Sequence, residues 1–438
     1  MAGQWGRWMS GSRWPARAVS RSGAAPRNLT PMPSTPPVGD PVPPDGSLPG
    51  QALDGLADTP LGFYLHVPFC AVRCGYCDFN TYSPDQLDVD AVSVWARSAH
   101  TEIDLAARVL GDRSPRLSTV FIGGGTPTMV PPALLTGLIQ HLRDSFGLLP
   151  DAEVTTEANP ETITPPVLEA LLEGGISRLS LGMQSSVPHV LRVLDRVHTP
   201  GRALEAVRLA RAAGFADISL DLIYGTPGES LGDWRASLDA ALGVAPDHLS
   251  AYALIVEDGT ALAARIRRGA LAGPDDDDLA DKYLAAEEVL TSAGYAWYEV
   301  SNWSRGTSHR SRHNLAYWRS HHWWGVGPGA HSHVGGVRWW NVRHPRRYGA
   351  LLAEGRSPGE GREVLHADQR RVERVLLELR IADGLPAGVL TDTERGRVPA
   401  LVDDGLLVDH PDAAPEGRLV LTLRGRLLAD AVVRRLLD

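Results

Sequence analysis

Between residues 61 and 255, short runs of β-branched and apolar residues alternate with longer amphipathic stretches. This alternation is typical of repeated βα units around a parallel sheet. The predicted strands cover residues 63–67, 118–122, 153–157, 178–182, 217–222 and 248–254. The predicted helices between them cover residues 90–110, 132–146, 164–173, 201–213 and 230–242. The sequence therefore predicts an α/β fold, a partial (β/α)6 barrel whose site lies at the carboxyl ends of the strands.

The domain boundaries follow from where this alternation starts and stops. Residues 1–58 begin with arginines and no acids and become rich in Pro and Gly, so we expect a disordered or mistakenly assigned extension, with Met32 as an alternative start. The barrel is expected over 59–300, and a Trp- and His-rich connecting segment over 301–360. A winged-helix-like α+β domain is expected over 361–438.

Shorter elements are predicted after the barrel units. A helix over 281–292 and a strand over 297–302 precede the connecting segment. In the last domain, a helix is predicted over residues 370–379. The segments 401–407, 418–421 and 424–437 that follow suggest a helix, a β-ribbon and a final helix. The ribbon is crowded by Asp403, Asp404, Asp409 and Asp412. These acids favour a packing or lid role for the domain over DNA binding.

Charge and cysteine content restrict the partners and the compartment. The 438 residues carry a formal net charge of −9 with acids and bases interspersed, which argues against a nucleic-acid partner. No apolar run is long enough to span a bilayer, so only a peripheral membrane contact stays open. The three cysteines crowd into one short loop, which is not a secreted disulfide pattern and predicts a cytoplasmic protein.

The cysteine loop comes directly after the first predicted strand. Cys70, Cys74 and Cys77 are separated by three and two residues. Three closely spaced thiolates can bind three irons of a [4Fe-4S] cluster and leave the fourth iron open to a small molecule. One alternative is a zinc site with His66 or Asp78 as fourth ligand, and another is three unrelated buried cysteines.

A glycine-rich turn and four polar residues fall at the ends of other predicted strands. In the segment 121–128, missing side chains let backbone groups approach a ligand closely, which makes Gly124, Gly125 and Thr126 candidate binding residues. The polar strand-end residues are Glu157, Gln184, Arg196 and Asp221. Each of these, taken alone, is equally typical of a structural ion pair.

These motifs together resemble the radical S-adenosylmethionine (SAM) superfamily. Within it they resemble the anaerobic coproporphyrinogen dehydrogenase group, and the HemW-type heme chaperones above all. The resemblance covers roughly residues 60–435. It rests first on the glycine turn and on the start of the cysteine loop, Tyr64-x-His66-x-Pro68-Phe69-Cys70. Three further motifs support it: Asp221-Leu-Ile-Tyr-Gly-Thr-Pro-Gly228, Tyr298-Glu-Val-Ser-Asn302 and His313-Asn-Leu-Ala-Tyr-Trp318.

The resemblance implies two cofactors, a [4Fe-4S] cluster and SAM. In the superfamily, SAM chelates the open iron, and an electron from the cluster breaks its sulfonium bond to give a 5′-deoxyadenosyl radical. The residues implied to line the SAM pocket are Tyr64, Tyr76, Gly124, Gly125, Thr126, Glu157, Gln184, Arg196 and Asp221. An electron donor for the cluster is implied as a partner.

Two features favour a heme chaperone over a dehydrogenase. The decarboxylating enzymes have a fourth cysteine two residues after the third, where this chain has Phe79. The motif at 313–318 is shared by the heme chaperones and associated with heme binding, so His313 is the candidate axial ligand of heme. The same aromatic and histidine cluster is alternatively a cap on the barrel.

Two functions are therefore open. The first is a heme chaperone that delivers heme to an unidentified acceptor protein. The second is an oxygen-independent coproporphyrinogen III dehydrogenase, an oxidoreductase that turns two propionate side chains into vinyl groups with loss of CO2. The chaperone is favoured, and the choice between them decides whether the chain is an enzyme.

Overall fold

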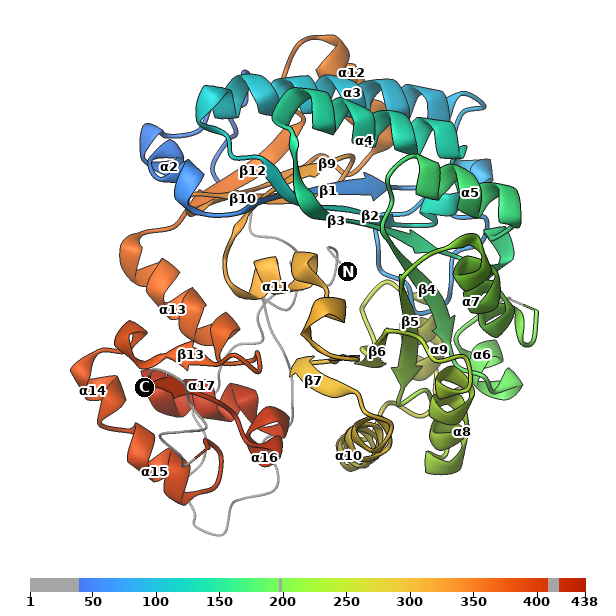
Figure 1. Cartoon of the computed structure of the whole chain (residues 1–438), viewed down its shortest axis with the longest axis vertical. Coiled ribbons are helices and arrows are strands. Elements are labelled where there is room, and N and C mark those ends of the chain that lie inside the picture. The colour runs from blue at the N-terminus through green and yellow to red at the C-terminus, as the bar shows by residue number, and fades with distance from the viewer. Residues whose placement is uncertain (1–38, 197–198, 409–416) are drawn as a thin grey trace.

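The structure is a computed structural model that describes residues 39–196, 199–408 and 417–438. Its centre is a set of parallel strands that curves around the middle of the molecule (Figure 1). These strands are β1 (Leu61–Val67), β2 (Leu117–Gly124), β3 (Leu148–Ala158), β4 (Arg178–Gln184), β5 (Asp217–Tyr224) and β6 (His248–Ala253). They pair in sequence order, each parallel to the next. The six predicted strands are confirmed.

The helices between these strands cover the outer face of the sheet (Figure 1). They are α3 (Ala91–Leu110), α4 (Pro132–Phe146), α5 (Pro165–Glu173), α7 (Arg202–Ala213) and α8 (Leu231–Leu242), together with the short α6 (Pro188–Val193). A second short helix, α9 (Ala261–Arg267), follows β6, and neither short helix was predicted. In α4 and α5 a proline occupies the first turn, where no backbone N–H is needed. Over the described ranges, none of the helices has both the length and the apolar surface that crossing a membrane requires.

Residues beyond the sixth unit extend the same sheet. α10 (Asp276–Ser292) leads into β7 (Ala296–Glu299) and β8 (Asn302–Ser304), a pair of antiparallel strands where one strand was predicted. The Trp- and His-rich segment supplies α11 (Arg312–Trp318), β9 (His322–Val326), β10 (His331–Val334), β11 (Val337–Asn341), α12 (Pro345–Ala353) and β12 (Gly359–Val364). The full strand order is β12-β11-β10-β9-β1-β2-β3-β4-β5-β6-β8-β7. Every residue of β9 is buried, so the alternation that marks a half-exposed strand is missing there.

The C-terminal lobe, residues 367–438, has a hydrophobic core of its own. It contains α13 (Ala367–Glu378), β13 (Leu385–Pro386), α14 (Asp392–Arg395), α15 (Val398–Asp403), β14 (Arg418–Leu419), α16 (Leu423–Leu427) and α17 (Ala429–Leu437). β13 and β14 form a short two-stranded sheet, and the predicted final helix is broken at Leu428. Asp409 and Asp412 lie outside the described residues.

Residues 39–58, which the sequence assigns to an unfolded extension, pack against the sheet. Asp40 exchanges backbone hydrogen bonds with Arg362 of the edge strand β12, at 2.8 and 2.9 Å. In α2 (Gly50–Leu53) and the turn after it, Ala52 and Leu56 are buried in the main core. Asp40 thus covers an otherwise open sheet edge while Ala52 and Leu56 add to the core, roles that composition does not reveal. Residues 1–38 lie outside the described part of the chain.

Deleting residues 1–58 is expected to lower the free energy of unfolding by about 2–4 kcal/mol, because the buried Ala52 and Leu56 leave the core and the outer edge of β12 loses its backbone hydrogen bonds to Asp40. A chain that starts at Met32 is the matched control, and the sequence predicts that it keeps the stability of the full chain. Urea denaturation of both variants measures the difference. Equal stability of the two variants would contradict the packing of residues 39–58.

Candidate functional site

A cavity of about 740 Å³ lies at the carboxyl ends of the central strands. Sites for small molecules usually have volumes of roughly 300–1,000 Å³. The residues on its wall that the sequence predicts are Cys70, Cys74, Tyr76, Cys77, Gly124, Gly125, Thr126, Glu157, Gln184, Arg196 and Asp221. They come together because parallel strands end at the same edge of the sheet. Tyr64 and His313, the two remaining candidates, lie elsewhere.

The cysteine loop is held to the barrel from both sides. The backbone N–H of Cys70 donates to the carbonyl of Tyr82 at 3.1 Å, and that of Gly75 donates to Leu194 at 3.0 Å. Arg196 Nη1 donates to Cys74 Sγ at 3.6 Å, so a cation faces this sulfur. All three cysteines are free thiols, and thiolate sulfurs are the ligands that iron–sulfur clusters use.

Burial makes two of the three thiols harder to ionise. Desolvation raises the pKa of Cys70 and raises that of Cys77 to about 12, because a buried thiolate loses its hydration. A bound cationic metal centre offsets this cost and keeps a coordinating thiol deprotonated. The donor set of this loop therefore fits an iron–sulfur cluster.

His66 is not available as the fourth ligand of a zinc site. Burial lowers its pKa to about 4, so the ring is neutral. Its Nε2 donates to the carbonyl of Asn80 at 2.9 Å, and its Nδ1 accepts from the Tyr64 hydroxyl at 2.9 Å. Tyr64, only 1% exposed, thus supports His66 beneath the cysteine loop and does not reach the cavity wall.

The glycine turn at the end of β2 lies against the cysteine loop. The N–H of Gly125 donates to Val67 and that of Thr126 donates to Phe69, both at 2.7 Å. A Cβ at Gly125 would lie 2.3 Å from the Phe69 carbonyl oxygen and 3.0 Å from Cys70 Sγ. Gly124 has φ of +115°, which side chains rarely allow. Only glycine fits at these two positions.

The polar strand-end residues surround the same space. Glu157 accepts a hydrogen bond from the N–H of Gly124 at 3.0 Å. Burial raises the pKa of Asp221 to about 6, although Ser180 donates to its carboxylate at 2.9 Å. Gln184 has φ of +66°, a strained conformation that is concentrated at functional sites. Carboxylates suit the amine and hydroxyl groups of a ligand, and Arg196 suits a carboxylate.

His313 lies inside the barrel near the start of β2, away from the cavity. It is 2% exposed and stacks on Phe121 with ring centroids 5.0 Å apart. Its Nδ1 is hydrogen-bonded to Thr119 Oγ1 at 2.8 Å and its Nε2 to the Tyr317 hydroxyl at 3.0 Å. Both ring nitrogens are engaged, so ligation of heme iron by His313 would require α11 to move. The geometry favours the alternative reading of this motif, a cap on the barrel.

His313→Ala is therefore expected to lower the free energy of unfolding by about 1–3 kcal/mol, through two lost buried hydrogen bonds, and to leave heme affinity and the Soret spectrum as in the wild type. Heme titration and urea denaturation check both parts. His321→Ala and His322→Ala serve as matched variants at the start of β9. A changed Soret band in His313→Ala alone would restore this histidine as the axial ligand.

The cavity wall also contains residues that the sequence analysis missed. Tyr224, Tyr252, Tyr283 and Trp297 come from the barrel and resemble ordinary core aromatics in the sequence. The C-terminal lobe contributes residues that include Arg380, Leu421, Arg426, Leu427 and Asp430. No local motif marks these positions, because segments far apart in the chain meet here only after folding.

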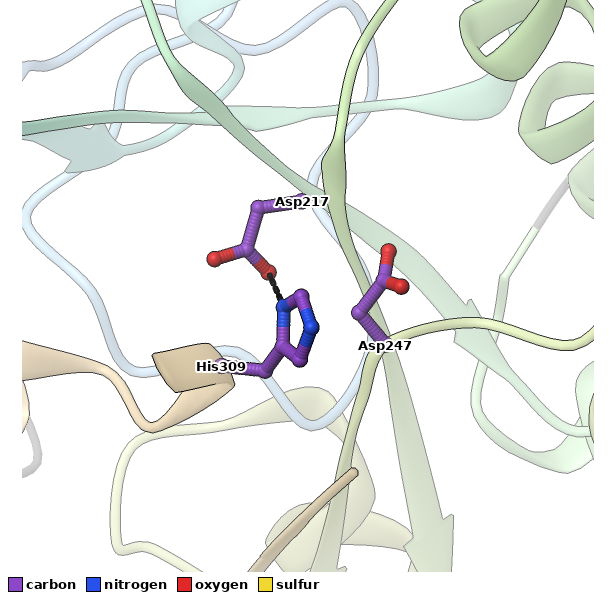
Figure 2. Close-up of side chains that lie close together, drawn as sticks. All are labelled: Asp217, Asp247 and His309. Atoms are coloured by element: carbon purple, nitrogen blue, oxygen red, sulfur yellow. Dashed lines mark ion pairs between the residues drawn. The ribbon is translucent and has the colours of Figure 1, made fainter. Parts of the chain in front are cut away.

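A second cluster of ionisable groups lies at the opposite end of the strands. Asp217 is the first residue of β5, and it lies with Asp247 and His309 in a group whose possible ligand atoms are within 4.8 Å of one another (Figure 2). Arg178 pairs with Asp217 and Arg211 with Asp247, each at 2.7 Å. The two guanidinium groups already neutralise these carboxylates. This cluster is a structural ion-pair network and not part of the site.

Comparison with known proteins identifies the family. Residues 64–241 match the radical SAM superfamily. The chain is 53% identical over 390 residues to the heme chaperone HemW of Mycobacterium tuberculosis, covering 89% of this chain and 97% of that protein. The chain belongs to the HemW heme chaperone family. The HemW protein of Bacillus subtilis is 32% identical over 378 residues, covering 84% of this chain and 97% of the relative.

A solved structure supports the fold of this HemW family member. Coproporphyrinogen III oxidase (HemN) from Escherichia coli superposes with a TM-score of 0.74 at 24% identity, covering 88% of this chain and 92% of that chain. The predicted family and the predicted α/β radical SAM fold are therefore confirmed. Membership of the radical SAM superfamily implies SAM and a [4Fe-4S] cluster as cofactors.

Proposed function

We propose that this protein is a heme chaperone, which binds heme and transfers it to an acceptor protein, and that it carries a SAM-binding [4Fe-4S] cluster. The observation that carries the proposal is the similarity to relatives named heme chaperone over nearly their whole length. Phe79 adds support, because it occupies the position where the decarboxylating enzymes have a fourth cysteine.

The cluster would be held by Cys70, Cys74 and Cys77. When bound, the cluster and SAM supply one-electron chemistry at the cavity. SAM would contact the residues around the glycine turn and the strand ends, which are Tyr76, Gly124, Gly125, Thr126, Glu157, Gln184, Arg196 and Asp221. Within that set, Arg196 would face the SAM carboxylate, and Glu157 and Asp221 would face the amine and ribose hydroxyls. Tyr64 would act through His66, by fixing the loop that carries Cys70.

The remaining partners follow from this chemistry. A protein that supplies one electron to the cluster is needed for any cleavage of SAM. The acceptor is a protein that takes up heme. We place these steps in the cytoplasm, because the three free thiols suit a reducing compartment.

Anaerobic incubation of the reconstituted protein with coproporphyrinogen III, SAM and a reductant tests the proposal against the dehydrogenase. We expect no protoporphyrinogen and no CO2, while heme binds in a saturable manner. Turnover to protoporphyrinogen would assign the chain to the oxidoreductase function instead. Absence of both turnover and saturable heme binding would contradict the proposed chaperone.

A further inference from the structure

The cavity extends beyond the expected SAM residues to the C-terminal lobe. α16 of this lobe lies beside α10 of the barrel (Figure 1), and Arg426 Nη1 lies 3.0 Å from Glu287 Oε1 across that contact. The cavity wall between the two ends is largely apolar and aromatic, and it includes Ile223, Tyr224, Leu254, Leu279 and Tyr283. A ligand in this part of the cavity would therefore need a large apolar body.

The far end of the cavity carries two guanidinium groups. Arg426 lies over Trp297 with 4.0 Å between its guanidinium carbon and the ring centroid, and its Nε has no hydrogen-bond partner among the described residues. Arg380 is 7% exposed, pairs with Asp430 and donates to the carbonyl of Leu376. A guanidinium has five N–H donors, so both groups keep capacity for a further acceptor.

The two ends of the cavity carry different polar groups. Glu157, Asp221 and Arg196 lie at the cluster end, where SAM would occupy them, whereas Arg380 and Arg426 lie at the lobe end, each beside one acidic partner, Asp430 and Glu287. Guanidinium groups bind carboxylates with charge-assisted hydrogen bonds. A molecule with an apolar aromatic body and carboxylates on one edge matches this arrangement when its carboxylates point toward the C-terminal lobe.

We propose that heme binds in this lobe-side part of the cavity, with its propionate carboxylates held by Arg380 and Arg426 and its ring against the apolar wall. This inference rests on the proposed heme chaperone function and adds where heme sits and what recognises it. It makes the C-terminal lobe one wall of the heme site. It also separates the heme site from His313, which does not line the cavity.

The test is a titration of the reconstituted wild-type protein with heme and with heme dimethyl ester, in which the propionates are blocked. We expect heme to bind roughly tenfold more tightly than the ester, since one charge-assisted hydrogen bond contributes about this factor. Equal affinity for heme and its ester would overturn the inference, and this comparison needs no variant. If wild-type protein shows no saturable heme binding at all, the proposed function fails, and the inference fails with it.

Substitutions of the two arginines test whether they contact the heme propionates. Arg426→Gln and Arg380→Gln should each weaken heme binding by roughly tenfold and reduce the preference for heme over its ester, while SAM binding stays at the wild-type level. Arg434→Gln is the matched control, because Arg434 is exposed on α17 of the same lobe and does not line the cavity. Wild-type heme affinity in both folded cavity variants, with folding checked by melting temperature, would overturn the assignment of these two arginines.

Discussion

Replacing Cys74 with alanine is expected to abolish the [4Fe-4S] cluster. Three thiolates are needed for three of the four irons, and among the described residues no other cysteine lies near the loop. Arg196 lies against Cys74 Sγ, so the substitution also removes the group that this half-buried cation faces. Iron and sulfide content after anaerobic reconstitution, together with the broad visible absorbance of the cluster, measure the loss.

Val72→Ala is the matched control for this experiment. Val72 lies in the same loop, is 63% exposed and has no group that binds iron, so this variant should retain a full cluster. SAM binding should be lost together with the cluster in Cys74→Ala and kept in Val72→Ala. A Cys74→Ala protein with wild-type iron, sulfide and absorbance would contradict the cysteine assignment.

Replacing Gly125 with alanine is expected to destabilise the glycine turn and to weaken SAM binding. The added Cβ would lie 2.3 Å from the carbonyl oxygen of Phe69, and a backbone atom has no rotamer into which it could move aside. Overpacking of this kind costs about 1–3 kcal/mol, and the displaced turn should reduce SAM affinity by roughly tenfold to a hundredfold. Equilibrium binding of SAM to the reconstituted protein and urea denaturation measure the two effects.

Gly137→Ala provides the control for this substitution. Gly137 lies within α4, and a Cβ there would meet no atom within 4 Å. The change should leave SAM binding unaltered and raise stability by about 0.5–1 kcal/mol, because alanine favours a helix over glycine. Unchanged SAM affinity in Gly125→Ala would show that the turn does not need its close contact with the cysteine loop.

The cluster end of the cavity was predictable from the sequence because its residues belong to short motifs at strand ends. Three thiols in one loop, glycines in a turn and a polar residue after a strand are local signals. The rule that parallel strands end at one edge then brings these segments together. The structure places the thiols, the glycines and the polar strand-end residues on one cavity wall. Tyr64 is the predicted SAM-pocket residue that does not line it, because its hydroxyl is hydrogen-bonded to His66.

The lobe end of the cavity could not be predicted in this way. Arg380 lies in the turn after α13 and Arg426 in α16, both far along the chain from the barrel strands, and their place in the cavity depends on how the lobe docks. The strands β9 to β11 escaped prediction because burial on both faces removes the period of two. His313 is the opposite case. The motif at 313–318 made this histidine a functional candidate, but both of its ring nitrogens are hydrogen-bonded inside the barrel.

Transfer of heme to an acceptor protein is the step that defines a heme chaperone, and a transfer assay measures it. Heme-loaded protein is mixed with an apo-form of a heme-binding protein of distinct Soret spectrum, and the acceptor spectrum is followed over time. The chaperone account predicts stoichiometric binding of heme to this protein, followed by transfer to the acceptor at a rate that depends on acceptor concentration. Heme that never binds in a saturable manner, or bound heme that the acceptor cannot remove, would contradict the account.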